Sequence, residues 1–157
     1  MLKVCLFIDV QNIYYTTKQS YQRQFNYRAF WNQATANRTV VGAFAYAIDK
    51  GDSKQLAFQN RLREIGFEIK LKPYIQRADG SAKGDWDVGI TLDVIDYATK
   101  ADVIVLLSGD GDFALLLNKV RDTYSITTEV YGVPAFTAPA LIQSSDRFIG
   151  IDNSLLL

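Results

Sequence analysis

Short apolar runs alternate with helical patterns along this chain, and this alternation constrains the fold more than any other feature. Runs of this length, rich in apolar and β-branched residues, predict strands that are buried on both faces. The predicted strands are Val4–Val10, Val40–Tyr46, Phe67–Leu71, Val103–Leu107 and Thr127–Tyr131. Strands that alternate with helices predict an α/β fold with a central, mainly parallel sheet covered on both faces.

The segments between these runs carry helical spacing. Phe58, Leu62 and Ile65 fall at positions i, i+4 and i+7, and Asp52 or Ser53 can cap the helix that Gly66 would end. Helical patterns also occur around residues 27–36, from 88 to 97, from 113 to 120 and near 140–143. Residues 76–84 lack periodicity and predict a loop, and residues 148–151 predict a short last strand.

Length and composition predict one globular domain over residues 1–157, because 48% of the residues are apolar. The single Cys5 lies within the first apolar run, which predicts a buried, inert thiol and excludes a disulfide within one chain. No apolar run approaches the ~20 residues of a membrane span, and the first strand begins almost at Met1. We therefore expect a cytoplasmic protein without a membrane partner.

The net charge is zero but unevenly distributed along the sequence. Residues 1–83 carry 13 Lys or Arg and 6 Asp or Glu, whereas residues 84–157 carry 4 and 11. A basic face beside an acidic cleft would suit a polyanion held near metal ions. The alternative is that folding interleaves the two halves and removes the asymmetry.

Four aspartates occur where predicted strands end or helices begin. Asp9 ends the first run, Asp110 and Asp112 follow the run over residues 103–107, and Asp87 precedes the helix from residue 88. The carboxyl ends of parallel strands meet at one edge of the sheet, so these acids are expected to converge there. Clustered carboxylates repel one another unless a cation lies between them, and oxygen ligands favour Mg²⁺ or Mn²⁺.

Other roles for the same residues remain open, and other active sites are excluded. Asp87 and Asp112 could be helix N-caps, and Asp110 could be a turn residue, whereas a buried Asp9 needs a partner.

The chain has no histidine, no GxGxxG and no GxxxxGK[ST], which excludes a Ser-His-Asp triad, a dinucleotide site and a Walker-A site. A haloacid-dehalogenase-like phosphatase would need an Asp where this chain has Gln11.

Four segments together resemble the NYN domain family, in particular its bacterial LabA-like branch. They are Phe7-Ile8-Asp9-Val10-Gln11-Asn12, Lys83-Gly84-Asp85-Trp86-Asp87-Val88, Ser108-Gly109-Asp110-Gly111-Asp112-Phe113 and Ser145-Asp146-Arg147-Phe148-Ile149. The resemblance implies a PIN-like three-layer α/β/α sandwich and a Mg²⁺- or Mn²⁺-dependent endoribonuclease. It implies metal ligation by Asp9, Asp87, Asp110 and Asp112, with Asn12 beside them in the catalytic site. The alternative is a non-catalytic PIN-like module that binds RNA or protein.

Neighbouring residues are weaker candidates for the same site. Asp85 competes with Asp87 for one role, and we prefer Asp87 because Val88 then starts the helix in register. Helical geometry places Asp93 about 120° around the helix from Asp87, so a cap or a salt bridge is the alternative to metal contact. Lys83 could meet a phosphate of single-stranded RNA, and Trp86 could stack on an unpaired base. We expect Tyr14 and Tyr15 to pack within the first helix rather than to stack on RNA. The sequence is compatible with a monomer or a homodimer.

Overall fold

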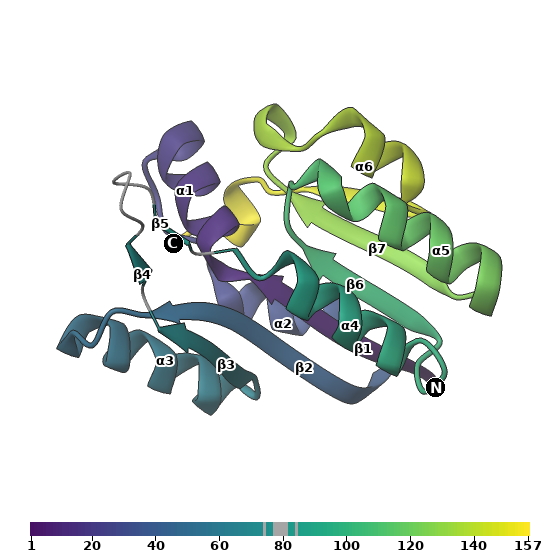
Figure 1. The fold of residues 1–157 in the computed structure, drawn as a ribbon, viewed down its shortest axis with the longest axis horizontal. Coiled ribbons are helices and arrows are strands. Elements are labelled where there is room, and N and C mark those ends of the chain that lie inside the picture. Colours follow the sequence, from purple (N-terminus) through teal and green to yellow (C-terminus); the bar gives the residue numbers. More distant parts are fainter. Residues whose placement is uncertain (74, 77–81, 84) are drawn as a thin grey trace.

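A six-stranded, entirely parallel sheet forms the centre of the molecule (Figure 1). The computed structural model describes the backbone of residues 1–73, 75–76, 82–83 and 85–157, and all of these side chains except those of 75–76 and 82–83. The strand order is β3-β2-β1-β6-β7-β8. The strands are β1 (Leu2–Asp9), β2 (Arg38–Asp49), β3 (Glu68–Pro73), β6 (Val103–Leu107), β7 (Thr127–Gly132) and β8 (Arg147–Gly150). The predicted α/β class and parallel sheet are confirmed.

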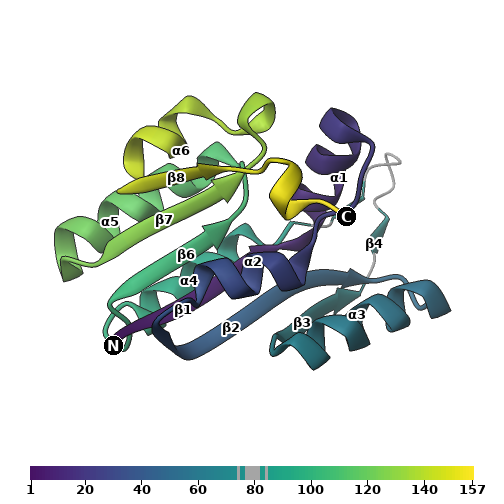
Figure 2. The same ribbon diagram turned by 180° about the vertical axis from the view of Figure 1, so that it is seen from behind.

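Helices cover both faces of this sheet. One face carries α1 (Val10–Tyr21), α2 (Tyr27–Ala34) and α3 (Ser53–Ile65), and the other carries α4 (Asp87–Tyr97), α5 (Ala114–Tyr124) and α6 (Pro139–Ser144). Figures 1 and 2 show the two faces in turn, with α4 and α5 before the sheet in the first view and α2 before it in the second. The 3-10 helices are η1 (Gly111–Phe113), η2 (Pro134–Phe136) and η3 (Asn153–Leu155). The three layers are those of the predicted sandwich.

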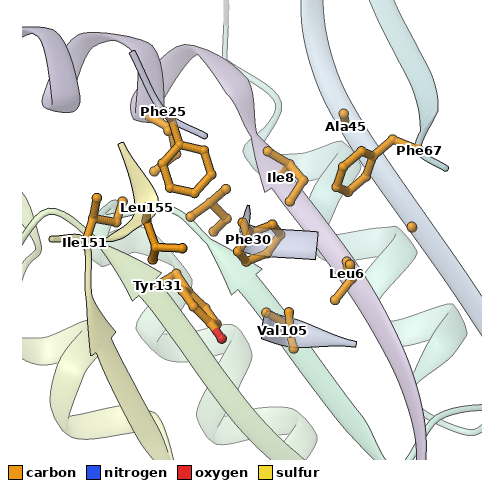
Figure 3. Packing of buried hydrophobic residues seen from close by; sticks show 14 of the residues in the cluster. Leu6, Ile8, Phe25, Phe30, Ala45, Phe67, Val105, Tyr131, Ile151 and Leu155 are labelled. Atoms are coloured by element: carbon orange, nitrogen blue, oxygen red, sulfur yellow. The ribbon is translucent and has the colours of Figure 1, made fainter. Parts of the chain in front are cut away.

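The central strand β1 shows why its sequence is apolar at nearly every position. Successive side chains of a strand point to opposite faces, and here both faces are covered. Leu6 and Ile8 pack beneath α2 with Phe30, whereas Cys5 and Phe7 pack on the opposite face. Figure 3 shows the first of these two cores, in which Phe30 meets Tyr131 with ring centroids 4.9 Å apart. The predicted burial of the Cys5 thiol is confirmed.

Local capping explains where the helices begin and end. The Asp52 carboxylate accepts a hydrogen bond from the backbone N–H of Gln55 at 2.7 Å, which confirms it as the cap of α3. Gly66 ends α3 with a φ of 136°, and a Cβ there would lie 2.7 Å from the Trp31 ring. Only glycine satisfies both requirements, as the sequence pattern predicted.

Three segments differ from the sequence-based expectation. The strand predicted over residues 40–46 extends in both directions, because the residues flanking its apolar centre still pair with β1 and β3. The polar stretch after β1 forms two helices, separated where Gln22 adopts a left-handed conformation. The predicted loop contains a two-stranded antiparallel pair, β4 (Ile75–Gln76) and β5 (Ala82–Lys83). The rest of that loop, 77–81 and 84, lies outside the described residues. No helix among the described residues is long and apolar enough to cross a membrane.

Candidate active site

The candidate site lies where the chain direction across the sheet reverses. From β1 the chain proceeds to β2 and β3 on one side, and it then crosses back to β6 on the other side of β1. The helices that follow these two neighbouring strands, α1 and α5, lie on opposite faces, which leaves a crevice at their carboxyl ends. The predicted adjacency of the first strand and the strand over residues 103–107 is confirmed.

Three carboxylates from three separate elements converge in this crevice. Asp9 is the last residue of β1, Asp87 is the first of α4, and Asp110 precedes η1. One oxygen from each lies within 4.8 Å of one from each of the others. The predicted convergence of these three side chains is therefore observed, and the three oxygens are close enough to share one small cation.

Asp9 is held by hydrogen bonds at the base of the crevice. Its side chain is only 9% exposed, and its Oδ2 accepts a hydrogen bond from the Ser108 hydroxyl at 2.9 Å. Its Oδ1 lies 3.5 Å from the backbone N–H of Asn12, which makes Asp9 the N-cap of α1. The buried carboxylate thus has the partner that the sequence argument required.

Asn12 and Ser108 connect the Asp9 strand to the loop that carries Asp110. The Asn12 Oδ1 accepts a hydrogen bond from the backbone N–H of Gly109 at 2.9 Å. The Ser108 Oγ, besides donating to Asp9, lies 3.2 Å from the Asp110 N–H and accepts from it. Ser108 is fully buried, and sequence reasoning gave it no role. The sequence feature that could have indicated a role for Ser108 is its position, directly after an apolar strand and directly before the Gly-Asp pair.

Burial and mutual repulsion favour the protonated forms of two of the acids. Burial raises the pKa of Asp9 from 3.8 to about 6, against the lowering effect of the Ser108 hydrogen bond and with a smaller contribution from the charge of Asp110. The pKa of Asp87 rises to about 7, first through burial and then through the hydrogen bond and charge of Asp110. A site of this kind holds unfavourable negative charge at neutral pH unless a cation is bound.

The remaining acidic candidates lie outside this group of three. Asp112 is exposed within η1, just before α5, and is not within the 4.8 Å group. It is not the helix N-cap either, because Asp110 caps η1 and Phe113 precedes α5. The Asp85 carboxylate accepts from the Asp87 N–H at 3.3 Å, so it supports Asp87 rather than replacing it. Asp87 is itself the first helical residue, so the alternative that it caps the helix does not hold.

Asp93 has a structural role on the far side of α4. Its Oδ2 accepts hydrogen bonds from the Tyr46 hydroxyl at 2.7 Å and from the Lys70 ammonium at 2.6 Å. The salt-bridge alternative proposed from the sequence is therefore confirmed. This pair ties α4 to β2 and β3 and fixes the rotation of the helix that presents Asp87.

The aromatic candidates differ in their burial from what the sequence suggested. Trp86 is partly buried, its indole N–H donates to the Ala47 carbonyl at 2.9 Å, and its ring packs 5.3 Å from that of Tyr46. Tyr14 and Tyr15 are 52% and 51% exposed, so the expectation that they pack within the fold is wrong. Stacking of RNA on Trp86 stays a prediction, and the side chain of Lys83 lies outside the described residues.

A pocket of about 240 Å³ opens above the three carboxylates. It is smaller than the roughly 300–1,000 Å³ of a cleft that encloses a whole small molecule, and it suits one unit of a longer substrate. Four of the lining residues are acidic, and the other four, all on α1, are polar or aromatic. The lining residues are Asp9, Gln11, Asn12, Tyr15, Thr16, Asp85, Asp87 and Asp110.

Comparison with known proteins assigns this chain to a family. The model of the NYN domain matches residues 3–152. The chain belongs to the NYN domain family. It is 26% identical over 162 residues to the low amplitude and bright protein LabA of Synechococcus elongatus, a match that covers 96% of this chain and 84% of LabA. NYN domains share the PIN-like nuclease fold, so the resemblance drawn from the sequence is confirmed.

A solved structure shares this NYN fold over almost its whole length. It is the crystal structure of VPA0982 from Vibrio parahaemolyticus, described as a protein of unknown function. The two chains are 51% identical, with a TM-score of 0.95, and the match covers 99% of this chain and 96% of the other.

Proposed function

We propose that this NYN domain is a Mg²⁺- or Mn²⁺-dependent endoribonuclease that hydrolyses phosphodiester bonds of single-stranded RNA. The observation that carries the proposal is the convergence of Asp9, Asp87 and Asp110 at the topological switch point of the sheet. Family membership supports the same chemistry. Asp112, exposed beside the three, is proposed as an additional ligand that approaches when substrate and metal are present.

The donor set fits a hard divalent cation. All three ligand atoms are carboxylate oxygens, which suit Mg²⁺ or Mn²⁺ better than zinc. Within the part of the chain that the structure describes, no lysine or arginine forms an ion pair with Asp9, Asp87 or Asp110. The raised pKa values of Asp9 and Asp87 mark charge repulsion that a bound cation would relieve.

The residues of the chain position the acids and keep them oriented. Ser108 and Asn12 fix Asp9 relative to the loop that carries Asp110, and the Trp86 anchor fixes the start of α4 before Asp87. When bound, a divalent cation activates an attacking water and stabilises negative charge on a phosphate oxygen. Because these hydrogen bonds are already made in the folded protein, the acids need little reorganisation to act.

The decisive experiment measures cleavage of labelled single-stranded RNA by the wild type and by Asp9→Asn, with Mn²⁺ and with EDTA. Asn preserves the size of the side chain but removes one negative charge. We expect cleavage by the wild type with Mn²⁺, none with EDTA, and a loss of at least about 100-fold in the variant. RNA binding by the variant should stay equal or tighten, because repulsion of phosphate decreases.

Three outcomes would contradict the proposal. Cleavage that survives EDTA or the substitution would show that the acids do not hold a catalytic metal. Absence of wild-type cleavage across several RNAs, with RNA binding retained, would instead identify a non-catalytic binding module. A drop in folding stability of Asp9→Asn without a selective loss of cleavage would assign Asp9 a structural role.

A further inference from the structure

Part of the pocket lining is neutral, although four of the lining residues are aspartates. Gln11 and Tyr15 lie on α1 at positions i and i+4, which places them on the same side of the helix. Both line the pocket that contains Asp9, Asp87 and Asp110. An amide and a phenol ring therefore stand side by side, directly next to the carboxylates.

The Tyr15 side chain has few contacts within the protein. The residue is 51% exposed, and its ring meets the Tyr14 ring edge-on, with centroids 5.3 Å apart. Within the described residues, neither the Tyr15 hydroxyl nor the Gln11 amide has a hydrogen-bond partner. A tyrosine that contributes only to the core would bury its ring, so this exposure leaves a surface available to a ligand.

We propose that Gln11 and Tyr15 form a subsite for one unpaired nucleobase of the RNA strand whose phosphate lies at the three acids. This inference rests on the proposed nuclease function. It adds that the site recognises an unpaired base of the RNA substrate. The Tyr15 ring stacks on the base face, and the Gln11 amide, which has both donors and an acceptor, hydrogen-bonds to the base edge.

The charge of the pocket favours binding of a base, rather than a second phosphate, next to Gln11 and Tyr15. Among the described residues that line the pocket there is no lysine or arginine, and their four carboxylates would repel another anion. A neutral ring and an amide match a neutral base instead. In a duplex the base faces are covered by stacking and the Watson–Crick edges are paired, so the subsite selects single strands.

The test compares RNA affinity and cleavage for Tyr15→Ala, Tyr15→Phe and Gln11→Ala. The probe is a short fluorescein-labelled oligoadenosine, bound in EDTA so that a metal-dependent enzyme cannot cut it, and measured by anisotropy. We expect Tyr15→Ala to weaken binding by about 5- to 150-fold, as the loss of one stacked base predicts. Tyr15→Phe should retain nearly all of the affinity, and Gln11→Ala should lose less than Tyr15→Ala.

Tyr14→Ala is the matched control, because Tyr14 is equally exposed on the same helix but does not line the pocket. A second control replaces single bases of the probe by abasic sites. At the position that occupies the subsite, the abasic probe should bind wild type at least as weakly as the intact probe binds Tyr15→Ala, because it also loses the Gln11 contact. Combining the two changes should give no further loss, because both remove the same contact.

Hydrolysis of methyl p-nitrophenyl phosphate, a phosphodiester without a base, separates the subsite from the nuclease itself. We expect Tyr15→Ala to raise the KM for RNA by a larger factor than the KM for this substrate, which has no base for the subsite to bind. If wild type cleaves RNA and Tyr15→Ala binds and cleaves it as Tyr14→Ala does, the proposed base subsite is wrong, whereas the proposed nuclease function is retained. If wild type neither binds RNA nor hydrolyses either substrate, both proposals are wrong.

Discussion

At the scale of single residues, Asp9 determines how the site responds to protons. It is nearly buried, yet only the Ser108 hydroxyl and a long contact to the Asn12 N–H compensate its charge. Its pKa of about 6 lies above the ordinary value of 3.8, and that of Asp87 lies at about 7. Folding therefore opposes ionisation of both carboxyl groups. Raised pKa values of this kind are typical of functional sites, and both groups belong to the candidate site.

The first prediction is that the metal-free protein loses stability as pH rises. Between about pH 4 and pH 6 the folded protein keeps a proton on Asp9 that the unfolded chain has released, so the free energy of unfolding falls through this range. For Asp9 alone we expect a loss of about 1 to 2 kcal/mol between about pH 5 and pH 7.5, measured by urea unfolding in EDTA. Asp87 adds to the effect in the same direction.

Asp9→Asn is the control for this pH dependence. The variant cannot ionise at residue 9, so its stability should change less between the two pH values, and at neutral pH it should equal or exceed that of the wild type. A wild-type protein that is as stable at about pH 7.5 as at about pH 5 would contradict the raised pKa values.

The second prediction concerns the metal. At neutral pH, Mn²⁺ should raise the midpoint of thermal unfolding, because it binds the folded protein and not the unfolded chain. At a concentration about 100 times its Kd the gain should be about 2.7 kcal/mol. The gain should shrink near pH 5, where protons compete for the same oxygens. The stabilisation by Mn²⁺ should also be smaller in Asp87→Asn. A wild-type unfolding midpoint that does not change with millimolar Mn²⁺ would argue against a metal site.

At the scale of secondary-structure elements, the start of α4 decides where Asp87 lies. Trp86 is anchored through its indole N–H to Ala47 and lies between the Lys72 ammonium, 4.5 Å from the ring centroid, and the backbone of Gly89. A Cβ at Gly89 would come within 2.5 Å of the Trp86 ring. The helix thus needs a residue without a side chain at a position where helix propensity alone would favour alanine.

The third prediction is that Gly89→Ala destabilises the protein by about 1 to 2 kcal/mol, since the clash with an anchored ring outweighs the gain in helix propensity. Because Trp86 directly precedes Asp87, we also expect lower ribonuclease activity and altered Trp86 fluorescence. Val88→Ala, at a residue 71% exposed on the same helix, should change stability by less than about 0.5 kcal/mol. Equal effects of the two substitutions would refute this account.

At the scale of the whole molecule, a buried ion pair links parts of the sheet that are not neighbours. The Arg38 guanidinium donates to both oxygens of Glu129, at 2.9 and 2.8 Å, and also to the Ala34 carbonyl. Arg38 begins β2 and Glu129 lies in β7, with β1 and β6 between them in the sheet. The pair therefore ties the two halves of the sheet together beside the end of α2.

The fourth prediction is that Glu129→Gln destabilises the protein by about 2 to 3 kcal/mol, because it leaves the Arg38 charge poorly compensated. Asp122→Asn is the control, since its ion pair with Arg121 is exposed and should contribute at most about 1 kcal/mol. Neither residue lines the pocket, so metal-dependent cleavage per folded molecule should be unchanged in both variants. Loss of cleavage in fully folded Glu129→Gln would contradict this separation of stability from activity.

The sequence by itself determined the strands of the central sheet, their parallel arrangement and the places where the acids emerge. These features depend on local chemistry: apolar runs buried on both faces, Asp52 as a cap, Gly66 as a stop, and a carboxylate at the end of β1. Each signal lies within a few residues along the chain, and the alternation of strands and helices restricts the topology to a few choices.

Only the tertiary structure decided how closely the acids meet. The sequence already favoured Asp87 over Asp85, because the predicted helix begins at Val88, but the position of the Asp87 carboxylate depends on how α4 is rotated by its contacts with β2 and β3. The hydrogen bonds of Ser108 and the exposure of Tyr15 likewise depend on residues far away in the sequence. A difference of one residue rotates a helical side chain by about 100°, so the geometry of the site follows from packing and not from local pattern.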